Sequence, residues 1–283
     1  SKLLTAFNSP ASNCRYLFNR LPFGICVSQD LFQEAMDKIT RSLPGVISIA
    51  DDICVFGKDK EEHDQNLHRL MDRACSEGLA LNKEKCHINV KEMSFFGMIY
   101  SAEGVRPDPE RVQEITKLDP PCSKKELQTF LGLVQYLAPF LPHLSAQTAP
   151  LRSLLKKEAA FTWTSTHTAA FSRVKESIAQ ASTLHYFDPN LTTKLQVDAS
   201  QEGLGAALLQ IHPETQAERV ISYASKSLTD TEKRYANIER ELLAIVFGVE
   251  KFHTYLFGAH TVVETDHKPL ENIHQKNLAQ TPP

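Results

Sequence analysis

Two adjacent carboxylates, Asp51 and Asp52, constrain how residues 44–58 can fold. Short β-branched runs flank them, Val46-Ile47-Ser48-Ile49 before the pair and Ile53-Cys54-Val55-Phe56 after it. Such runs, joined by a tight connection, predict a β-hairpin. The Asp-Asp pair lacks the glycine that a two-residue turn prefers, and neighbouring carboxylates repel unless a cation or a proton neutralises one of them. The pair therefore indicates either a Mg²⁺ site built from oxygen ligands or an ordinary solvated turn.

The composition of the 283-residue chain is globular, with 42% hydrophobic and 23% charged residues, and the length accommodates two domains or one large one. A formal net charge of −3 gives no basic footprint typical of nucleic-acid binding. The six cysteines include no C-x-x-C pair, which disfavours a zinc site and favours reduced thiols. No apolar run reaches the length of a membrane-spanning helix. We expect an intracellular protein, in the cytoplasm or nucleus, without membrane attachment.

Apolar spacing predicts the elements of the first part of the chain. Helices are expected at 28–40, with Ser28 as the cap and its apolar stripe in the core, and at about 60–78, ending at Gly78. Residues 79–86 and 93–100 are predicted as short strands, the second broken at Gly97. Together with the hairpin, this order predicts an antiparallel sheet with helices on one face, an α+β fold.

After Pro107 the composition shifts toward helices, predicted at about 108–118, 123–137, 145–156 and 166–180. Ser123 and Glu126 have the spacing of a capping box at the second of them. The basic residues of this region either meet nucleic-acid phosphates or form a solvated face. They are Lys124, Lys125, Arg152, Lys156 and Lys157.

From Lys194 the pattern predicts three antiparallel strands, a helix over about 231–252, and a fourth strand. A helical crossover favours parallel pairing of this fourth strand with the first, so Asp198 and Asp266 would leave the sheet at one edge. Glu241 lies among apolar residues of the helix and is expected to face the sheet. Three convergent carboxylates suit two-metal hydrolysis of a phosphodiester. The alternative is three unrelated acids at the solvated ends of elements.

Two sets of segments carry a family resemblance. The first set is L-P-F-G-I, I-A-D-D-I-C-V-F-G, N-K-E-K-C, F-F-G-M-I-Y-S-A-E-G-V-R-P and F-L-G-L-V-Q-Y, and it resembles the reverse transcriptase of gypsy-class LTR retrotransposons. The second set is D-A-S-Q-E-G-L-G-A-A-L-L-Q, S-K-S-L-T-D-T-E-K-R-Y, E-R-E-L-L-A-I-V and E-T-D-H-K-P-L, and it resembles the RNase H domain that follows in the same Pol polyprotein. The resemblance covers essentially the whole chain in the order of the family.

The resemblance implies a division of the chain into a partial polymerase palm (residues 1–106), a small helical thumb or connection (107–160), a connecting helix and linker (161–190), and an RNase H-like α/β domain with a mixed sheet (191–283). It implies two Mg²⁺ ions, or Mn²⁺ in their place, at each of two sites. The implied catalytic and metal-binding residues are Asp51 and Asp52 in the polymerase, and Asp198, Glu241 and Asp266 in the RNase H-like domain.

The resemblance also implies substrate contacts. Leu21, Pro22, Phe23 and Gly24 would pack under the incoming nucleotide, Lys85 would lie on the strand behind the Asp pair, and Phe96, Gly97 and Met98 would form the hairpin that grips the primer. The implied substrates are an RNA template, a DNA primer, dNTPs and an RNA–DNA hybrid. The implied activities are RNA-directed DNA synthesis and cleavage of the RNA strand of the hybrid, whose groove shape and 2′-hydroxyls the domain recognises.

Three departures from the family pattern bear on activity. A further metal-binding Asp upstream of L-P-F-G falls outside the chain, as do the fourth acid and last helix of RNase H, so we expect a piece truncated at both ends. Ile49 occupies the position of the tyrosine in the common Y-x-D-D pattern. The alternative function is therefore a catalytically decayed or host-adopted remnant that binds nucleic acid.

Overall fold

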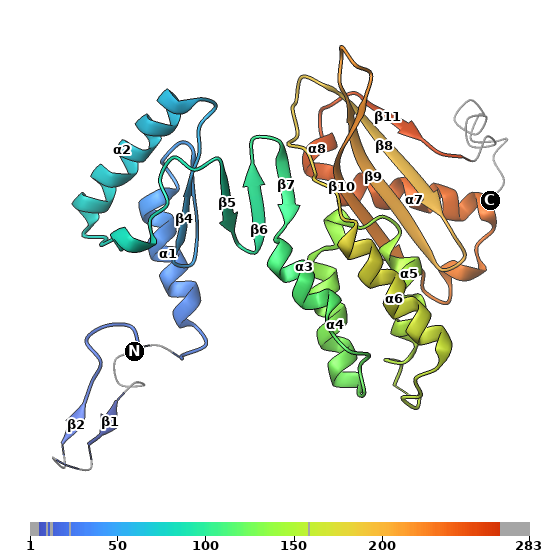
Figure 1. Cartoon of the computed structure of the whole chain (residues 1–283), viewed down its shortest axis with the longest axis horizontal. Helices are drawn as coiled ribbons and strands as arrows, with labels where there is room; N and C mark the ends of the chain where they lie inside the picture. The colour runs from blue at the N-terminus through green and yellow to red at the C-terminus, as the bar shows by residue number, and fades with distance from the viewer. Residues whose placement is uncertain (1–5, 10, 12–13, 23, 158, 267–283) are drawn as a thin grey trace, which may run out of the picture. The chain divides into compact units, whose positions relative to one another are not determined.

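The computed structural model describes residues 6–9, 11, 14–22, 24–157 and 159–266 (Figure 1). The chain forms two compact units, residues 1–91 and residues 92–283. Small antiparallel sheets with helices are followed by a mixed four-stranded sheet, which confirms the expected α+β class. Among the described residues, no helix combines the length and apolar character needed to cross a membrane.

The first unit is built around a short hairpin and two helices. In chain order its elements are β1 (Phe7–Asn8), β2 (Arg15–Tyr16), α1 (Ser28–Thr40), β3 (Val46–Ile49), β4 (Asp52–Val55), α2 (Lys60–Glu77) and a 3₁₀ turn (Lys83–Lys85). Strands β1 and β2 pair antiparallel, as do β3 and β4. Helix α2 begins at an Asp59 cap and ends at Gly78, whose φ of 69° is the left-handed conformation that glycine adopts freely.

Two expectations for α1 are wrong. Ser28 is the first helical residue rather than the cap, and its hydroxyl donates to the carbonyl of Pro22 over 2.9 Å. The apolar stripe is only partly in the core: Met36 is 2% exposed, whereas Leu31 and Phe32 are 48% and 40% exposed. The reason is that α1 packs mainly on β3 and α2, which cover only the Met36 side of the helix in this unit.

The strand predicted over residues 79–86 is also wrong. Lys83–Lys85 form a 3₁₀ turn, and the side chain of Asn82 accepts a hydrogen bond from the backbone N–H of Glu84 over 3.0 Å. Asparagine side chains commonly compete with strand pairing in this way, because they satisfy local backbone donors. The second predicted strand is correct in its break at Gly97, where β5 (Glu92–Phe95) turns into β6 (Met98–Ser101).

The second unit begins with a three-stranded antiparallel sheet and a group of helices. Its elements are β5, β6, β7 (Gly104–Pro107), α3 (Pro109–Thr116), α4 (Lys124–Tyr136), a 3₁₀ turn (Ala138–Phe140), α5 (Leu144–Ser153) and α6 (Ser165–Ala179). The four predicted helices are confirmed. The capping box of α4 is half formed, because the Ser123 hydroxyl accepts from Glu126 N–H while the Glu126 carboxylate accepts from Cys122 N–H.

The mixed sheet of the second unit contains β8 (Thr192–Ala199), β9 (Gly203–Ile211), β10 (Glu218–Ser227) and β11 (Thr261–Glu264) in the order β10-β9-β8-β11. Strand β11 pairs parallel with β8, as predicted from the helical crossover. Helix α7 (Asn237–Lys251) is shorter than predicted, because residues 232–234 form a separate 3₁₀ turn, and α8 (His253–Leu256) follows it.

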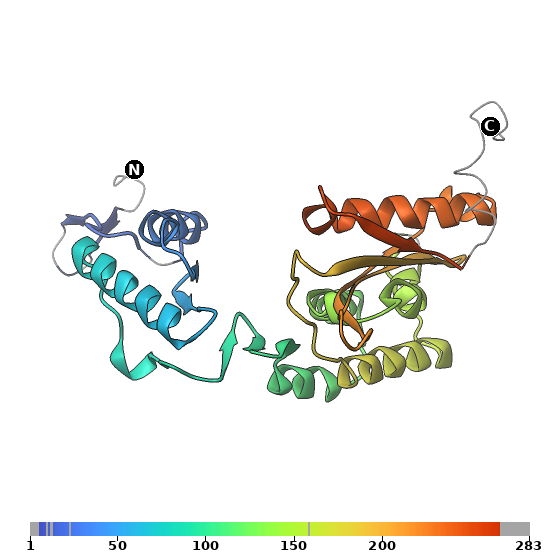
Figure 2. The ribbon, with the colours of Figure 1, turned by 90° about the horizontal axis from the view of Figure 1, so that it is seen from above.

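Helices cover both faces of this sheet. Figure 2 shows α7 on one face, while α5 lies on the opposite face against β9 and β10. Helix α7 approaches closely at Gly248, where an added Cβ would lie only 3.1–3.2 Å from the side chains of Leu195 and Val197. Leu195 is fully buried and Val197 is 3% exposed. This packing fixes the height of α7 above the sheet and thereby the position of Glu241.

An extended segment joins the two sheets of the second unit. Leu184 forms an isolated antiparallel bridge with Val105 of β7, and His185 N–H donates to the carbonyl of Val220 in β10 over 2.8 Å. The hydroxyl of Tyr186 donates to the carbonyl of Ser101 over 2.9 Å. Consecutive residues of one segment thus bond to the three-stranded sheet and to the four-stranded sheet.

Candidate functional site

Asp198 and Asp266 lie at the same edge of the mixed sheet. Glu264, the last residue of β11, pairs with Gln196 of β8, and each aspartate lies two residues further along the chain. Because the two strands are parallel, both chains leave the sheet in the same direction. Asp266 is exposed to solvent, and Asp198 is partly exposed, with 49% of its side chain accessible.

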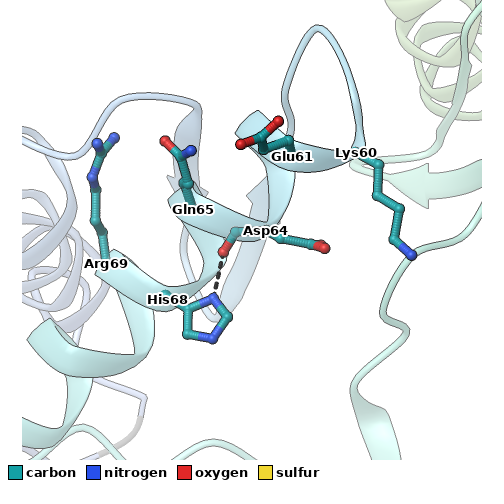
Figure 3. Close-up of a pocket in the computed structure, with 6 residues that line it drawn as sticks. All are labelled: Lys60, Glu61, Asp64, Gln65, His68 and Arg69. Atoms are coloured by element: carbon teal, nitrogen blue, oxygen red, sulfur yellow. Dashed lines mark hydrogen bonds between the residues drawn. The ribbon is translucent and has the colours of Figure 1, made fainter.

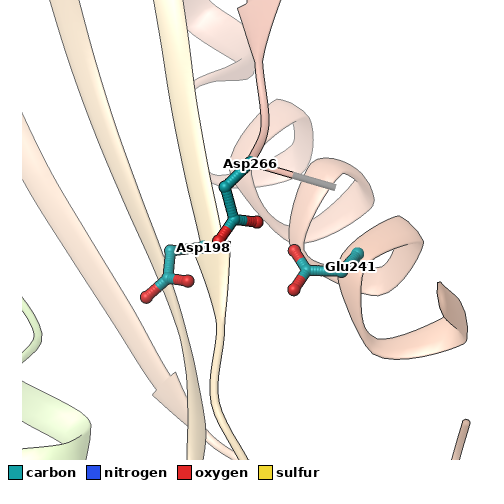
Figure 4. Close-up of side chains that lie close together, drawn as sticks. All are labelled: Asp198, Glu241 and Asp266. Carbon is teal, nitrogen blue, oxygen red and sulfur yellow. The ribbon is translucent and has the colours of Figure 1, made fainter. Parts of the chain in front are cut away.

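Glu241 approaches the two aspartates from the first turns of α7 (Figure 4). The carboxylate oxygens of Asp198, Glu241 and Asp266 lie within 4.8 Å of one another. Glu241 is 3% exposed, and its buried Oε2 atom has no hydrogen-bond partner. Burial, followed by the charges of Asp266 and Asp198, raises the pKa of Glu241 to about 7, and only Arg240 opposes the shift.

This cluster suits a divalent cation of the Mg²⁺ or Mn²⁺ class. Its ligand atoms are all carboxylate oxygens, which hard cations prefer to nitrogen or sulfur. The unpaired buried oxygen of Glu241 is costly unless a proton or a cation satisfies it. A cation among the three acids would satisfy that oxygen and remove the mutual repulsion. The sequence-predicted triad is therefore brought together, with Glu241 facing inward as expected.

Lys194 is a supporting residue that the sequence reasoning missed. Its Nζ atom lies 2.6 Å from Oε1 of Glu218 in β10 and also contacts Glu264 in β11. The Gln196 side chain donates to the other oxygen of Glu264 over 2.9 Å. These bonds attach β11, the strand that leads to Asp266, to the rest of the sheet. The sequence shows only a lysine within a predicted strand; its low exposure, 11% of the side chain, is a property of the structure.

A cleft of about 300 Å³ adjoins the two aspartates. Small residues of β9, including Gly205 and Ala207, line it together with Tyr223 of β10. Pro142 and His143 enter from the segment just before α5, in a different part of the unit. The acidic cluster therefore opens onto a hollow large enough for part of a nucleotide chain.

A second hollow runs along α2 and contains none of the predicted site residues (Figure 3). Lys60, Glu61, Asp64, Gln65, His68 and Arg69 line it, and all six belong to this one helix. The ring of His68 bonds to the carbonyl of Asp64 within the helix. A surface formed by a single helix face does not enclose a ligand, and we assign it no function.

The Asp51–Asp52 pair lies at the tip of the β3–β4 hairpin, but the turn differs from the predicted one. The turn residues are Ala50 and Asp51, and Asp52 is the first residue of β4, paired with Ile49. Ala50 takes the positive φ of 53°, which explains why no glycine is needed at the aspartates. Both carboxylates are exposed. Among the described residues, no third acid, His or Cys completes a metal-binding group with them.

Gln33 of α1 holds this turn and was not predicted from the sequence. Its Oε1 atom accepts from Ala50 N–H over 2.7 Å, and its Nε2 atom donates to the carbonyl of Ser48 over 3.1 Å. One side chain thus bonds to the backbone just before the aspartates. A polar residue on an otherwise amphipathic helix gave no distinguishing signal.

The remaining predicted contact residues have varied positions. Leu21 is 45% exposed, and the carbonyl of Pro22 accepts the hydrogen bond from the Ser28 hydroxyl. Gly24 has a φ of 82°, and Phe23 lies outside the described residues. Lys85 ends the 3₁₀ turn and is exposed, so the strand expected to carry it is absent there.

The hairpin expected at Phe96, Gly97 and Met98 is present as the β5–β6 turn. Phe96 and Gly97 form its tip with φ values of 50° and 71°, and Met98 is buried at the start of β6. Phe96 is 58% exposed, while its carbonyl accepts a hydrogen bond from the hydroxyl of Tyr136 in α4. Helix α4 therefore holds the tip of the hairpin in place.

Two family models match separate parts of the chain. Residues 1–100 match the reverse transcriptase (RNA-dependent DNA polymerase) family, and residues 163–263 match the RNase H-like domain found in reverse transcriptase. The second match contains Asp198 and Glu241 and ends three residues before Asp266.

Curated relatives match over nearly the whole chain. It is 34% identical over 280 residues to the retrovirus-related Pol polyprotein from transposon opus of Drosophila melanogaster, covering 94% of this chain and 28% of that protein. It is 34% identical over 274 residues to the Pol polyprotein from transposon 297 of the same organism, covering 95% of this chain and 25% of that protein. The chain thus spans about a quarter of the length of these relatives.

Solved structures of the foamy viral protease-reverse transcriptase share the fold. A complex of its dRH form with double-stranded DNA matches with a TM-score of 0.84 and 23% identity, covering 99% of this chain and 49% of that one. A complex with an RNA/DNA hybrid matches with a TM-score of 0.79 and 23% identity, covering 99% and 38%. The collinear family matches, the relatives and the shared fold agree: the chain belongs to the reverse transcriptase and RNase H-like region of the retrotransposon and retroviral Pol polyproteins.

Proposed function

We propose that the RNase H-like part of this chain cleaves the RNA strand of an RNA–DNA hybrid, with divalent cations held by Asp198, Glu241 and Asp266. The observation that carries the proposal is the buried Glu241 carboxylate, which has one oxygen without a partner and belongs to a group of three carboxylates whose ligand atoms lie within 4.8 Å of one another. A domain that kept only the fold would have no use for this costly group. An RNase H-like fold by itself would not argue for chemistry, because one fold hosts many functions.

The three acids would divide the work by their positions. Bound Mg²⁺ ions supply an activated water and stabilise charge on the leaving oxygen. Glu241 is buried on the core side of the site and would hold a cation from that side. Asp198 has 49% of its side chain exposed beside the cleft, so it would hold a cation on the side from which the strand approaches. Lys194 holds β11 so that Asp266 stays opposite Asp198.

We further propose that the Asp51–Asp52 pair takes part in RNA-directed DNA synthesis, where it would hold Mg²⁺ or Mn²⁺ and the cation would in turn bind the dNTP triphosphate. The match of residues 1–100 to the polymerase family and the exposed carboxylates on a turn held by Gln33 support this. Leu21, Pro22, Phe23, Gly24 and Lys85 would lie near the nucleotide, and Phe96, Gly97 and Met98 near the primer end. The partners would be an RNA template and a DNA primer, in keeping with the duplex and the hybrid bound by the foamy viral enzyme.

A strand-specific cleavage assay tests the nuclease proposal. The full chain is incubated in Mg²⁺ with a hybrid whose RNA and DNA strands carry different labels, beside single-stranded RNA and duplex DNA. We expect fragments of the RNA strand of the hybrid alone, and removal of the metal by EDTA should stop their formation. The matched variant Asp198→Asn keeps the size of the side chain and should lose cleavage by about 10²-fold or more.

The same preparation separates the nuclease from the alternative, a module that binds nucleic acid without chemistry. Such a module would bind the hybrid with an affinity that falls steeply with salt, because phosphate contacts release counterions. It would show no turnover, and Asp198→Asn would leave its behaviour unchanged. For the polymerase proposal, primer extension on an RNA template should be lost in Asp51→Asn, and equal extension by the variant would contradict it.

A further inference from the structure

His143 lies beside the acidic cluster although it belongs to a different part of the chain. It precedes α5, yet its Nδ1 atom lies 3.7 Å from Oδ2 of Asp198 in β8. This distance is too long for a direct hydrogen bond, so the imidazole lies beside the carboxylate without a hydrogen bond to it. His143 also lines the 300 Å³ cleft. Its side chain is 59% exposed and accessible from the cleft.

The backbone holds this histidine in an unusual conformation. His143 has a φ of 51°, a left-handed value that few residues other than glycine adopt, although histidine does so more often than most. The following turn is attached to the sheet, because Ser145 N–H donates to the Ser225 hydroxyl of β10 over 3.0 Å. The contact of this turn with β10 therefore helps to hold the backbone of His143 at the cleft.

Strand β9 leaves room for the imidazole at Gly205. A Cβ at this position would lie 3.2 Å from His143 Nδ1, closer than most real Cβ contacts, and 3.6 Å from Cε1, an ordinary van der Waals distance. Gly205 is also the residue of β9 that pairs with Asp198. A residue without a side chain thus lets the ring approach the sheet directly beside the acid.

The negative charge of the cleft indicates a role for the histidine in binding phosphate. The lining residues include the acids Asp198, Glu264 and Asp266, and His143 is the one basic side chain among them. A nucleic-acid strand that enters this cleft brings phosphates into a negative environment. Cations among the acids offset part of the repulsion, and an N–H donor at the edge of the cleft would offset more.

We propose that His143 is a substrate-binding residue of the RNase H-like site, and that its imidazole donates a hydrogen bond to a phosphate of the strand bound beside Asp198. The inference rests on the proposed binding of a hybrid at this cluster and adds a residue from outside the mixed sheet. The segment just before α5 would then contribute directly to the nuclease site, in addition to the packing of α5 on one face of the sheet. His143 contacts the strand and is not a metal ligand.

Binding measurements on the full chain test this role. The dissociation constant for an RNA–DNA hybrid is measured in Ca²⁺, which occupies oxygen sites, and in metal-free buffer; cleavage kinetics are measured in Mg²⁺. His143→Gly removes the ring and tolerates the positive φ, so it tests the ring without straining the turn. His143→Asn retains an N–H donor and also tolerates that φ. His260→Gly is the matched control, since His260 is exposed just before β11, at the end of the strand remote from Asp266.

We expect His143→Gly to weaken hybrid binding about tenfold, the effect of one charge-assisted hydrogen bond, and to raise KM with little change in kcat. His143→Asn should stay within about threefold of the unsubstituted chain, and His260→Gly should match it. The affinity for Mn²⁺, followed by its electron paramagnetic resonance signal, should be unchanged in His143→Gly.

Three results would overturn the inference: hybrid binding by His143→Gly within twofold of the unsubstituted chain, no hybrid binding by the unsubstituted chain, or a loss of Mn²⁺ affinity parallel to the loss of hybrid affinity. A chain that binds the hybrid through His143 but does not cleave it would support the inference while contradicting the proposed nuclease activity.

Discussion

Asp198 and Asp266 follow the paired residues Gln196 and Glu264 of the parallel strands β8 and β11 at the same distance, two residues further along the chain. The parallel register alone therefore brings two carboxylates to one edge, and α7 adds Glu241 from the buried side. Three acids within 4.8 Å of one another destabilise the metal-free fold. The free energy of unfolding in metal-free buffer therefore reports the repulsion among these three carboxylates.

The first prediction concerns Glu241 and pH in metal-free buffer. Its pKa is raised from 4.5 to about 7, so between these values the folded protein keeps a proton that the unfolded chain has released. The free energy of unfolding should therefore fall as pH rises from about 4.5 to about 7 and then level off. Glu241→Gln should remove this dependence and be more stable than the unsubstituted chain at pH 8 by about 1–3 kcal/mol.

Urea unfolding followed by the fluorescence of Trp163 makes this measurement. Trp163 is the single tryptophan of the chain and packs on Phe171 in the second unit, so its signal reports the unit that contains Glu241. Glu250→Gln is the control, because Glu250 is exposed on the same helix. A Glu241→Gln variant less stable than the unsubstituted chain at pH 8 would show that ionised Glu241 does not destabilise the metal-free fold.

The second prediction concerns added metal. Mg²⁺ binds the ionised carboxylates, so it should raise the free energy of unfolding by about 1.4 kcal/mol at ten times its dissociation constant. It should also reverse the pH trend, since ionised Glu241 becomes the favoured form. Calorimetric titration should show this binding in the unsubstituted chain and its loss in Asp198→Asn and Asp266→Asn. Equal stabilisation of Asp198→Asn would place the ion elsewhere.

The third prediction concerns Lys194. Lys194→Met leaves the carboxylates of Glu218 and Glu264 without their shared cation, and it should lower the free energy of unfolding by about 1–2 kcal/mol. The hydrogen bond from Lys194 lowers the pKa of Glu264, so this stabilisation is present near neutral pH and is lost as the carboxylate protonates in acid.

Arg111→Met is the matched control for Lys194, because Arg111 and Glu114 form a pair with both side chains more than 60% exposed. Such pairs contribute little, so the urea midpoint should not move. Equal effects of the two substitutions would mean that Lys194 acts only as a surface charge. A selective loss of Mg²⁺ affinity in Lys194→Met would support its role in placing Asp266.

The fourth prediction compares two glycines of the second unit. Gly104 has a φ of 141°, and an added Cβ would overlap the carbonyl oxygen of Leu184, so Gly104→Ala should cost about 2 kcal/mol or more. Gly132 lies on the exposed side of α4 with open space around it, and Gly132→Ala should stabilise the protein by about 0.5–1 kcal/mol. Urea midpoints that shift in the same direction for both variants would contradict this account.

Local sequence signals predicted the elements that depend on periodicity and crossover rules. The helices of the second unit and the parallel pairing of β11 with β8 follow from such signals, and so does the inward direction of Glu241. The resemblance of the motifs to a known family supplied the expected roles of the site residues.

Features that depend on distant contacts were not predictable in this way. The turn before Asp52 is fixed by Gln33, 17 residues before Ala50, and nothing in the hairpin sequence encodes that bond. His143 is separated from Asp198 by several elements and meets it only after α5 packs on β9 and β10. The stripe of α1 was expected in the core because periodicity identifies an apolar face without showing which neighbour covers it.

The most direct test of the central claim is the rate of RNA-strand cleavage in an RNA–DNA hybrid at saturating Mg²⁺, compared between the unsubstituted chain and Asp198→Asn. If the three acids form a metal-dependent nuclease centre, the unsubstituted chain cleaves the RNA strand and the variant is slower by about 10²-fold or more. Equal rates, or no cleavage by the unsubstituted chain while it binds both the hybrid and Mg²⁺, would contradict the claim.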